Sequence, residues 1–563
     1  MKFVTWIRKS RLPRRLLLLL CGVATLLVFV GAITPTPQLR PLAPEALRGR
    51  IQSIEEVAHE IDSVQDQSIR DLGLEKGLPA PWEAICRRLS LALVGNGLSL
   101  EEYRTLEQIP EDDRVAWWTD YLLEDTRCSD YLSERLARAF VGTHDGQFLL
   151  YRRRRFRLWL AEQLQNNVRY DQIVRSMITS EGLWTSNPEV NFLTATFDEG
   201  NENRADPIRL AGRTSRAFLG MRIDCLQCHN DFVGNVQLGS SDSPRTGEQL
   251  DFHSLAAFYS SAAIHAPNVF AGVRNDKRKY EVTLLGSSEE SEIEPNVPFL
   301  RELLPESGAP REQLAAWVTN SENKAFARAT VNRFWALLFG KPLVDPVDDI
   351  PITGPYPAGL EILAEDFAKH DYDVKRLLRL IVASEAFQRD SRIDDEAIEV
   401  TSKHEEALAV FPMTPLRPEQ VAASLLQACR LQMIDDNSSI FSQLERFATV
   451  NDFTKAYGDL GEDEFVTQSV TIPQRLLMMN GRFLREHVKA NPIANASSQI
   501  AMLTRDNQTA VEAAYLSVLN RLPTKVESDA FLELLSAKDI SRSQAMAGVF
   551  WTLLNSTEFL WNH

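Results

Sequence analysis

Apolar residues recur at intervals of three and four along most of the chain, which is the spacing of one face of an amphipathic helix. Strand signals are sparse, and the best is residues 279–285 (KYEVTLL), which we interpret as one arm of a small hairpin. The sequence therefore predicts a mainly α-helical protein with at most a small β-hairpin. Helices are expected at residues 84–94, 111–123, 131–140, 157–164, 170–178, 311–318, 326–338, 360–367, 374–387, 417–432, 475–488, 511–519 and 545–554.

The first 34 residues follow a different pattern. Residues 1–15 carry six bases and no acid, and residues 16–33 form an uninterrupted run of 18 small and apolar residues. This length lies between a secretory signal and a spanning helix. We expect residues 16–34 to be a single transmembrane anchor, with residues 1–15 in the cytoplasm and the body on the periplasmic side of the cytoplasmic membrane. Cleavage near Val30-Gly31-Ala32 is the alternative, and it would release the same exported body.

A shift in composition divides the exported body. Residues 266–300 collect Pro, Gly and Asn, and they include the acidic run 287–294 without apolar periodicity. We expect this stretch to be a linker between one helical domain at 50–265 and a second at 301–563. The two domains would follow the transmembrane helix in that order.

The charge balance excludes one class of partner. The chain has 563 residues with 61 bases and 77 acids, and an ordinary globular composition of 44% hydrophobic and 25% charged residues. Without the six bases of the N-terminal segment, 55 bases against 77 acids give the body a net charge of about −22. Such an acidic body repels nucleic acid and anionic lipid, so we expect no nucleic-acid partner.

The signatures of several common enzyme classes are absent from the sequence. It contains no GxxxxGK[ST] phosphate loop, GxGxxG fingerprint, GxSxG nucleophile elbow or HExxH metal-binding pair. These absences remove the classes that are easily recognised, and they leave open whether the protein is an enzyme.

One short motif carries candidate chemistry: Cys225-Leu226-Gln227-Cys228-His229, the CxxCH pattern of c-type haem attachment. Two thiols at this spacing reach both vinyl groups of one porphyrin, and the adjacent imidazole then lies over the iron as its proximal ligand. Attachment takes place outside the cytoplasm, in agreement with the expected export. We therefore predict one covalent c-type haem on Cys225 and Cys228, with its iron bound by His229.

Other interpretations of this motif stay open. A local Cys225–Cys228 disulfide needs only the two cysteines, and a redox dithiol would prefer a βαβ setting that this region does not show. A zinc site would need two further ligands, and the sequence has no second CxxC or nearby cysteine pair.

A second axial ligand for the iron is harder to identify. Met177, Met221, His253 and His265 have suitable side chains. We include His253 among the candidate haem-binding residues because it begins an apolar helical stretch after the motif. A capping or core histidine explains His253 as well.

Two further polar clusters have a structural and a functional interpretation. Four consecutive arginines at 152–155 point all round a helix, and we expect them to pair with acidic residues, with haem propionates as the alternative partner. Asn332-Arg333 and Asp348-Asp349 could line a binding cleft. A helix cap and a buried salt bridge explain them equally well.

Segments throughout the chain resemble a known pair of planctomycete domains. Those similar to the planctomycete cytochrome-C-like domain, also called domain of unknown function 1549, are residues 86–91 (CRRLSL), 95, 98–102 (LSLEE), 216–223 (RAFLGMRI), the CxxCH motif and 252–259 (FHSLAAFY). Those similar to the planctomycete-specific domain of unknown function 1553 are residues 326–329, 331–335, 340, 344–349, 384–388, 416–420, 520–524 and 554–559. The resemblance implies a haem-carrying domain followed by a helical domain, and no specific reaction.

The chain departs from the family pattern in two places. The family's HDHPF is His229-Asn230-Asp231-Phe232 here, and its later HP is Tyr356-Pro357. If the second histidine of that pattern is an iron or metal ligand in relatives, this protein lacks it.

These observations together predict an exported, membrane-anchored, cytochrome-c-like protein for electron transfer or other redox work at the cell envelope. Its expected partners are the membrane and a redox or envelope protein. The alternatives are a haem-free structural or interaction protein whose CxxC forms a disulfide, and a thiol–disulfide oxidoreductase.

Overall fold

The computed structural model describes residues 44–144, 151–197, 204–240, 243–265, 270–395, 398–435, 438, 440–458, 461, 465, 471–489, 491 and 495–563. The expected cytoplasmic segment 1–15 and anchor 16–34 lie outside these residues. No helix within the described ranges combines the length and the hydrophobicity that crossing a membrane requires.

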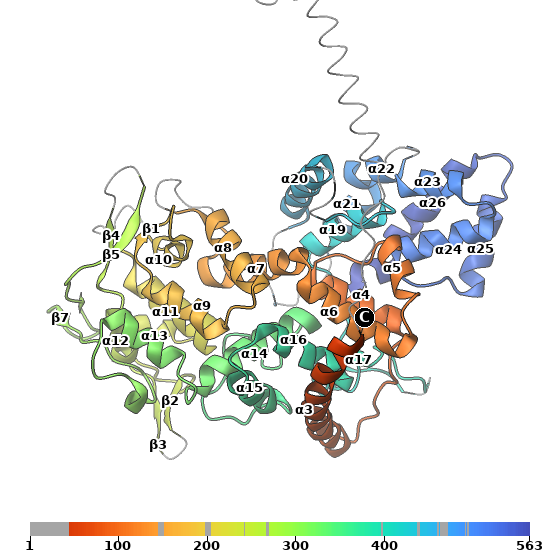
Figure 1. The fold of residues 1–563 in the computed structure, drawn as a ribbon. Helices are drawn as coiled ribbons and strands as arrows, with labels where there is room; N and C mark the ends of the chain where they lie inside the picture. The colour runs from red at the N-terminus through yellow and green to blue at the C-terminus, as the bar shows by residue number, and fades with distance from the viewer. Residues whose placement is uncertain are drawn as a thin grey trace, which may run out of the picture.

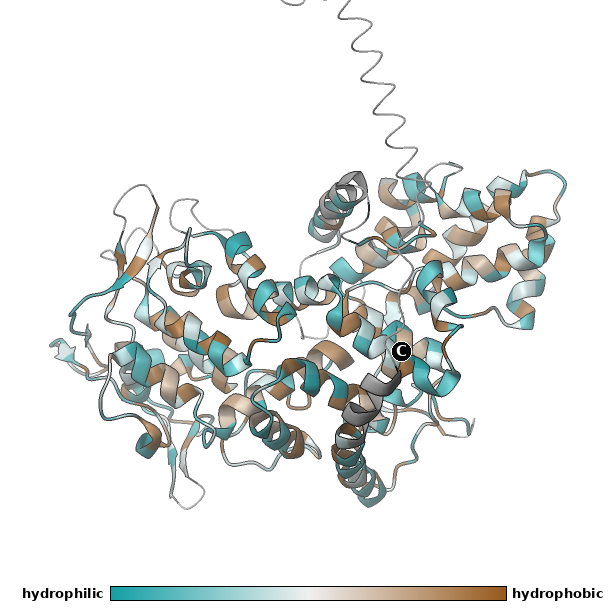
Figure 2. Ribbon diagram, in the orientation of Figure 1, coloured by the Kyte–Doolittle hydropathy of each residue, from teal (hydrophilic) through white to brown (hydrophobic). Residues whose placement is uncertain are grey.

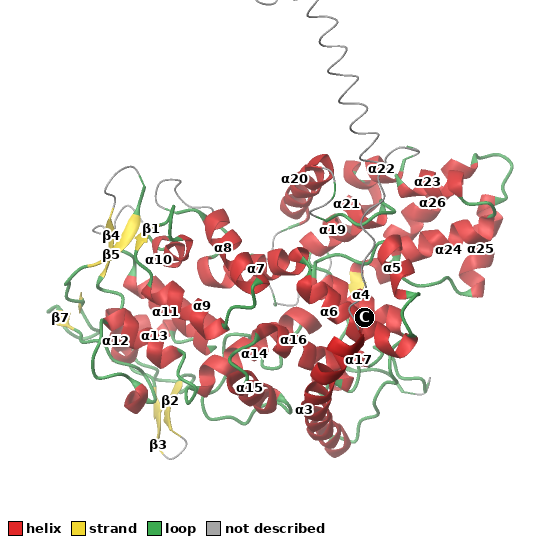
Figure 3. Ribbon diagram, viewed as in Figure 1, coloured by secondary structure: helices red, strands yellow, loops and turns green. Residues whose placement is uncertain are grey.

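The described chain is mainly helical, as predicted (Figure 3). Up to residue 257 the α-helices are α3 (Pro44–Asp71), α4 (Trp82–Leu93), α5 (Leu100–Leu106), α6 (Arg114–Glu124), α7 (Thr126–Val141), α8 (Arg153–Gln165), α9 (Tyr170–Thr179), α10 (Asn191–Thr194), α11 (Pro207–Leu219) and α12 (Gln249–Ala257). Between residues 310 and 428 they are α13 (Pro310–Val318), α14 (Lys324–Phe339), α15 (Leu360–Lys369), α16 (Val374–Ala383), α17 (Glu385–Gln388), α18 (Ser402–Glu406) and α19 (Pro418–Ala428).

The C-terminal region continues the helical pattern. Its helices are α20 (Ile440–Tyr457), α21 (Ile472–Asn480), α22 (Arg482–Val488), α23 (Ala496–Leu503), α24 (Asn507–Val518), α25 (Lys525–Leu535), α26 (Arg542–Leu554) and α27 (Thr557–Leu560). Short 3-10 helices lie at Glu111–Asp113 (η1), Pro188–Val190 (η2), Asp224–Gln227 (η3) and Arg301–Leu303 (η4). Each segment expected to be helical is helical over most of its length. Gly481 divides one of them into α21 and α22.

Strands form four small sheets in the described residues, so the prediction of at most one hairpin was wrong. The expected hairpin is present, since β6 (Glu281–Val282) pairs with β7 (Ser291–Glu292). The other strands are β1 (Gly182–Leu183), β5 (Gly272–Asn275) and β4 (Ala262–His265), which form one antiparallel sheet in that order, β2 (Gln237–Ser240) paired with β3 (Ser243–Thr246), and β8 (Thr414–Pro415) paired with β9 (Trp561–Asn562). These strands are two to four residues long, which is too short for a visible apolar alternation.

Residues 270–300, which we expected to belong to a linker, pack against the first half of the chain. β5 lies between β1 and β4, and Ile293, Val297 and Phe299 are buried. The N–H of Asn296 also donates to the carbonyl of Ser254 in α12 at 3.2 Å. The longest exposed run of this stretch is 285–290, at the tip of the β6–β7 hairpin.

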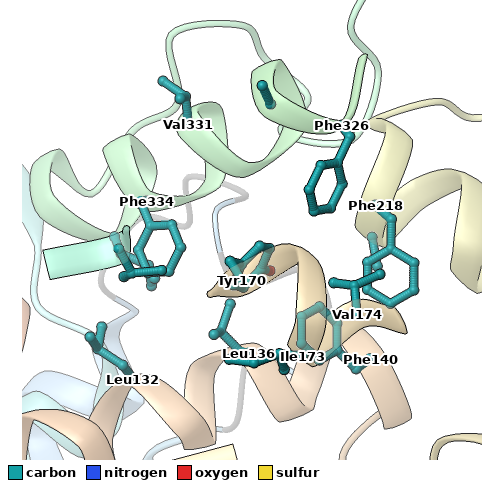
Figure 4. Close-up of a cluster of buried hydrophobic side chains, with 14 of the residues drawn as sticks. Leu132, Leu136, Phe140, Tyr170, Ile173, Val174, Phe218, Phe326, Val331 and Phe334 are labelled. Carbon is teal, nitrogen blue, oxygen red and sulfur yellow. The ribbon is translucent and has the colours of Figure 1, made fainter. Parts of the chain in front are cut away.

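Two hydrophobic cores hold the described chain together. The first takes its side chains mainly from residues 61–411 and joins α7, α9 and α11 to α14 (Figure 4). Tyr170 of α9 stacks on Phe326 with 5.9 Å between ring centroids and meets Phe334 edge-on at 6.0 Å. The second core takes its side chains from residues 416–560, with Leu91 from α4. The first core therefore crosses the expected boundary at 266–300.

The helices of both cores are amphipathic. Brown, hydrophobic positions are interleaved with teal, polar ones along the helices of both cores (Figure 2). α16 shows why such a helix forms: its apolar residues Leu377, Leu378 and Ile381 are buried, and Asp373 caps its first turn by accepting the N–H of Arg376 at 2.9 Å.

α11 and α12 frame the CxxCH motif at the left of Figure 1. Asp206 begins α11 by accepting the N–H groups of Ile208 and Arg209 at 2.9 and 3.3 Å. Gly220 ends it in a left-handed backbone conformation with φ 62°, and a β-carbon there would lie 3.0 Å from the Ile350 side chain. The chain therefore turns sharply after α11 and passes through η3 before α12 begins.

Candidate functional site

The CxxCH loop buries one of its residues, Leu226, and exposes both cysteines and the histidine. Leu226 is fully buried, whereas Cys225, Cys228 and His229 are exposed. Gly247 makes room for the leucine, because a β-carbon at that position would lie only 2.6 Å from Leu226 Cδ1. A buried side chain between the two cysteines thus fixes which way the thiols face.

The backbone of the loop is held from behind by α12. The carbonyl of Gln227 accepts two hydrogen bonds, one from Nε2 of His253 at 3.0 Å and one from Nε2 of Gln249 at 3.1 Å. Both donors are buried side chains of the same helix. Because the two bonds use both lone pairs of this carbonyl, the peptide between Gln227 and Cys228 has a fixed orientation.

His253, our candidate for the second axial ligand, lies beneath the loop. Its Nε2 faces a carbonyl, which can only accept, so Nε2 carries the proton and Nδ1 accepts from the Tyr280 hydroxyl at 2.8 Å. Burial lowers the pKa of His253 and keeps the ring neutral. Both ring nitrogens are therefore engaged in this structure, and His253 positions the motif.

The next two residues, where the chain departs from the family's HDHPF, also shape the loop. Asn230 Oδ1 accepts the N–H of Gln249 at 2.8 Å, at the start of α12. Asp231 accepts the N–H groups of Val233, Gly234 and Val236 at 3.1, 3.0 and 2.6 Å. These backbone donors lower the pKa of Asp231. In this chain both positions are occupied by side chains that complete the turn.

His229 is oriented for ligation through one nitrogen. Its Nδ1 lies 2.7 Å from the carbonyl of Asn230 and donates to it, which leaves the lone pair on Nε2 without a proton. The ring is exposed and stacks near Phe232, with 6.2 Å between centroids and 20° between planes. A metal-binding histidine is commonly oriented in this way, by a hydrogen bond from its other nitrogen.

An apolar surface adjoins the thiols and the imidazole. Phe232 and Val233 are 78% and 81% exposed, and Leu250 of α12 is exposed as well. Exposed apolar side chains that cluster beside polar groups mark a surface that binds something. The site therefore combines two thiols and one imidazole with exposed apolar side chains.

The remaining axial candidates lie elsewhere in the fold. Met177 and Met221 are buried, and His265 is half-buried at the end of β4. Of the four arginines, Arg153 pairs with Glu134 through two bonds of 2.9 Å, as expected of a structural residue.

The remaining polar residues, Asn332-Arg333 and Asp348-Asp349, make structural contacts, and one of them joins the two halves of the chain. Arg222, just before the motif, makes a 2.8 Å ion pair with buried Asp348. Asn332 accepts the N–H of Val344 at 3.0 Å and donates to the carbonyls of Val344 and Val347 at 2.9 and 3.1 Å. Burial raises the pKa of Asp349. These contacts fit the structural interpretation of both clusters.

The other interpretations of the cysteines gain no support from this geometry. Cys225 and Cys228 are both free thiols. Burial and the nearby Asp231 raise the pKa of Cys225, whereas a thiol–disulfide enzyme needs a stabilised thiolate. The described part of the chain holds no cluster of three or more metal-binding side chains.

Sequence reasoning identified the motif but missed the residues that support it. Tyr280, Gln249 and Asn230 act through hydrogen bonds between residues 19 to 27 positions apart, and Gly247 acts through the space that it leaves for Leu226. Only the resemblance to the family gave a signal, because the resembling segment 252–259 falls largely within α12. The side-chain partners themselves required the fold.

Two family models match the chain. Residues 60–261 match PSCyt2, protein of unknown function (DUF1549), and residues 310–455 match PSD1, protein of unknown function (DUF1553). The matches occur in the order that the resembling segments predicted. No curated protein and no solved structure matches the chain.

Proposed function

Because the chain contains a PSCyt2 domain followed by a PSD1 domain, we propose that it is an exported cytochrome-c-like protein. In this proposal one c-type haem is bound covalently by Cys225 and Cys228, and His229 is its proximal ligand. The protein would carry electrons, or support related redox work, together with a redox protein of the cell envelope. Residues 16–34 would anchor it to the cytoplasmic membrane, with the body on the periplasmic side.

One observation carries the haem proposal: side chains of α12 hold the backbone of the loop, while both cysteines and His229 are exposed to solvent. Leu226 is buried, and Gln227 is bonded to His253 and Gln249, so the loop need not rearrange to present both thiols. Preorganised ligands lose less conformational entropy when they bind. A structural disulfide would need no exposed imidazole and no adjacent apolar surface.

The residues present fit a covalently bound porphyrin. The thiols supply the two thioether sulfurs, and Nε2 of His229 supplies an unprotonated nitrogen. Phe232 and Val233 would pack on the apolar ring and exclude water from it. When bound, the haem supplies reversible one-electron storage at its iron.

The residues that contact the loop would fix the position of the histidine ligand, and they would take no direct part in electron transfer. The Asn230 carbonyl holds the His229 ring in one orientation, with a proton on Nδ1, so Nε2 would be the nitrogen that could hold the iron. His253 stays neutral beneath Gln227 and adds no charge next to the site. The chain's contribution is therefore a fixed ligand geometry in an apolar setting.

The test is expression of the full chain with a cytochrome c maturation system, followed by a reduced-minus-oxidised spectrum and haem staining after denaturing electrophoresis. We expect a c-type spectrum and a stained band of full length. His229→Ala should abolish both signals, since it removes the proximal ligand. His59→Ala, an exposed histidine of α3, is the matched control and should leave them unchanged.

The cysteine variants separate haem from a disulfide. Under the haem proposal Cys225→Ser, Cys228→Ser and His229→Ala all reduce incorporation, whereas under the disulfide alternative His229→Ala is silent. A colourless, unstained full-length protein with free or disulfide-bonded thiols by mass spectrometry would refute the haem proposal. The interaction-protein alternative would then be favoured.

Topology has its own test. Alkaline phosphatase fused after Gly49 should be active and in the membrane fraction if residues 16–34 are an uncleaved anchor. An inactive fusion would reverse the orientation, and an active soluble one would show cleavage near Ala32.

A further inference from the structure

A second surface feature lies far from the CxxCH loop, on α21 (Figure 1). Ile472, Leu476 and Met479 are separated by four and three positions, so they share one face of the helix, and they are 76%, 53% and 45% exposed. Met478 points the other way and is buried in the second core. α21 therefore presents three apolar side chains outward, with Arg475 on the same side of the helix.

Neighbouring helices hold this face in place. Gln474 donates from Nε2 to the carbonyl of Tyr457 at the end of α20, at 2.9 Å. The indole N–H of Trp551 in α26 donates to the carbonyl of Met479 at 3.3 Å, and the indole ring is partly exposed. We call Ile472, Leu476, Met479 and Trp551 the α21 stripe. It is a fixed surface of the second core.

The charge around the stripe differs from that of the whole chain. Residues 471–491 carry four bases, Arg475, Arg482, Arg485 and Lys489, against one acid, Glu486, for a net charge of +3. The complete chain has a net charge of −16. Arg485 and Lys489 are exposed. A local basic edge beside an apolar helix face is typical of helices that lie in a membrane interface.

We infer that the α21 stripe lies against the surface of the membrane to which the chain is anchored, with its apolar side chains among the lipid headgroups. Tryptophan suits this position because its ring is apolar and its N–H is polar. The basic edge would face anionic headgroups, even though the body as a whole is acidic, since this attraction acts within a Debye length.

The position of the anchor places the body near such a surface. This step rests on the membrane attachment proposed above. Residues 35–43 connect the anchor segment to the start of α3, and nine extended residues span at most about 32 Å. The start of α3 would therefore stay within that distance of the membrane.

A second copy of the chain is a poorer occupant for the stripe. The four side chains together expose on the order of 400 Å², about half of what each partner of a stable dimer buries. The exposed bases Arg485 and Lys489 would also repel their counterparts in a second copy across a two-fold axis. Binding to lipid headgroups needs no large protein interface, and anionic headgroups attract basic side chains.

The experiment is hydrogen exchange on the full chain in nanodiscs of phosphatidylcholine mixed with phosphatidylglycerol, and in detergent. We expect the amides of 472–480 to exchange at least about tenfold more slowly in the discs. Ile472→Ser combined with Leu476→Ser should remove this protection. Val526→Ser is the matched control, because Val526 of α25 is 80% exposed and lies outside the stripe.

Each outcome bears on the inference. Equal exchange of α21 in discs and detergent, in a chain that stays with the discs, would overturn it and leave the anchor intact. A chain that does not stay with the discs would contradict the anchor and the inference together. Protection that grows with protein concentration in detergent would identify a second copy as the occupant. None of these readouts depends on haem.

Discussion

The hydrogen bond between Tyr280 and His253 offers a sharp test of how the CxxCH loop is built. The Tyr280 hydroxyl lies 2.8 Å from Nδ1 of His253, and both residues are buried. Tyr280→Phe removes this hydroxyl and keeps the ring. The ring nitrogen of His253 would then be a buried acceptor without a donor.

The size of the effect follows from that unpaired nitrogen. A buried polar atom left without a partner costs about 1–3 kcal/mol. Because the phenylalanine ring preserves most of the packing, we expect Tyr280→Phe to lower the free energy of unfolding of the first core by about 1–2 kcal/mol. Loosening His253 also loosens the Gln227 carbonyl. The amides of Leu226 and Cys228, bonded to Ile223 and Cys225, should therefore exchange faster.

The assay is denaturant unfolding followed by hydrogen exchange of peptides covering η3. Tyr372→Phe is the matched control, since Tyr372 is a buried tyrosine of the same core whose hydroxyl has no hydrogen bond among the described residues. A loss below about 0.5 kcal/mol for Tyr280→Phe, with unchanged exchange in η3, would refute the proposed tautomer and the positioning role of His253.

Three further predictions concern the same architecture. Burial lowers the pKa of His253 below its ordinary 6.5, so on acidification the histidine takes up a proton more readily in the unfolded chain than in the folded one. Thermal unfolding should therefore show stability falling as the pH drops below about 6.5. In His253→Gln, the dependence of stability on pH should be weaker. Leu226→Ala should cost about 2–5 kcal/mol by denaturant unfolding, because the side chain is fully buried. Arg88→Met should lower the melting temperature by the equivalent of about 3–5 kcal/mol, since it leaves three backbone carbonyls without their buried donor; an unchanged melting temperature would contradict this.

Helix periodicity predicted most of the fold because most helices bury one face. α9, α14 and α16 are examples, with buried apolar residues three and four positions apart. α3 was missed because its sequence is rich in charged residues and its apolar positions are few, and α11, α20, α23 and α25 also lie outside the predicted helices. The short strands were missed for another reason. They form where two loops meet, and no local pattern encodes that meeting.

For the candidate site, the sequence was sufficient to identify the motif but not the residues that contact it. The spacing of Cys225, Cys228 and His229 is local and therefore visible in the sequence. The role of His253 was not, since a histidine that contacts Gln227 and Tyr280 has the same sequence context as one that binds a metal. Only the positions of both partners distinguish positioning from ligation.

The segments that resembled two separate domains meet in the folded chain through the arginines of α4. Arg88, in segment 86–91, donates to the carbonyls of Phe387 and Arg389 at 2.8 and 2.7 Å, and Arg87 donates to the carbonyl of Glu558 at 3.2 Å. Phe387 and Glu558 belong to segments of the second domain's pattern. Cutting the chain between the two family matches would leave these guanidinium groups buried without acceptors, or expose the core around them. We therefore expect the two regions to depend on each other for folding, so haem attachment should be assayed on the full chain.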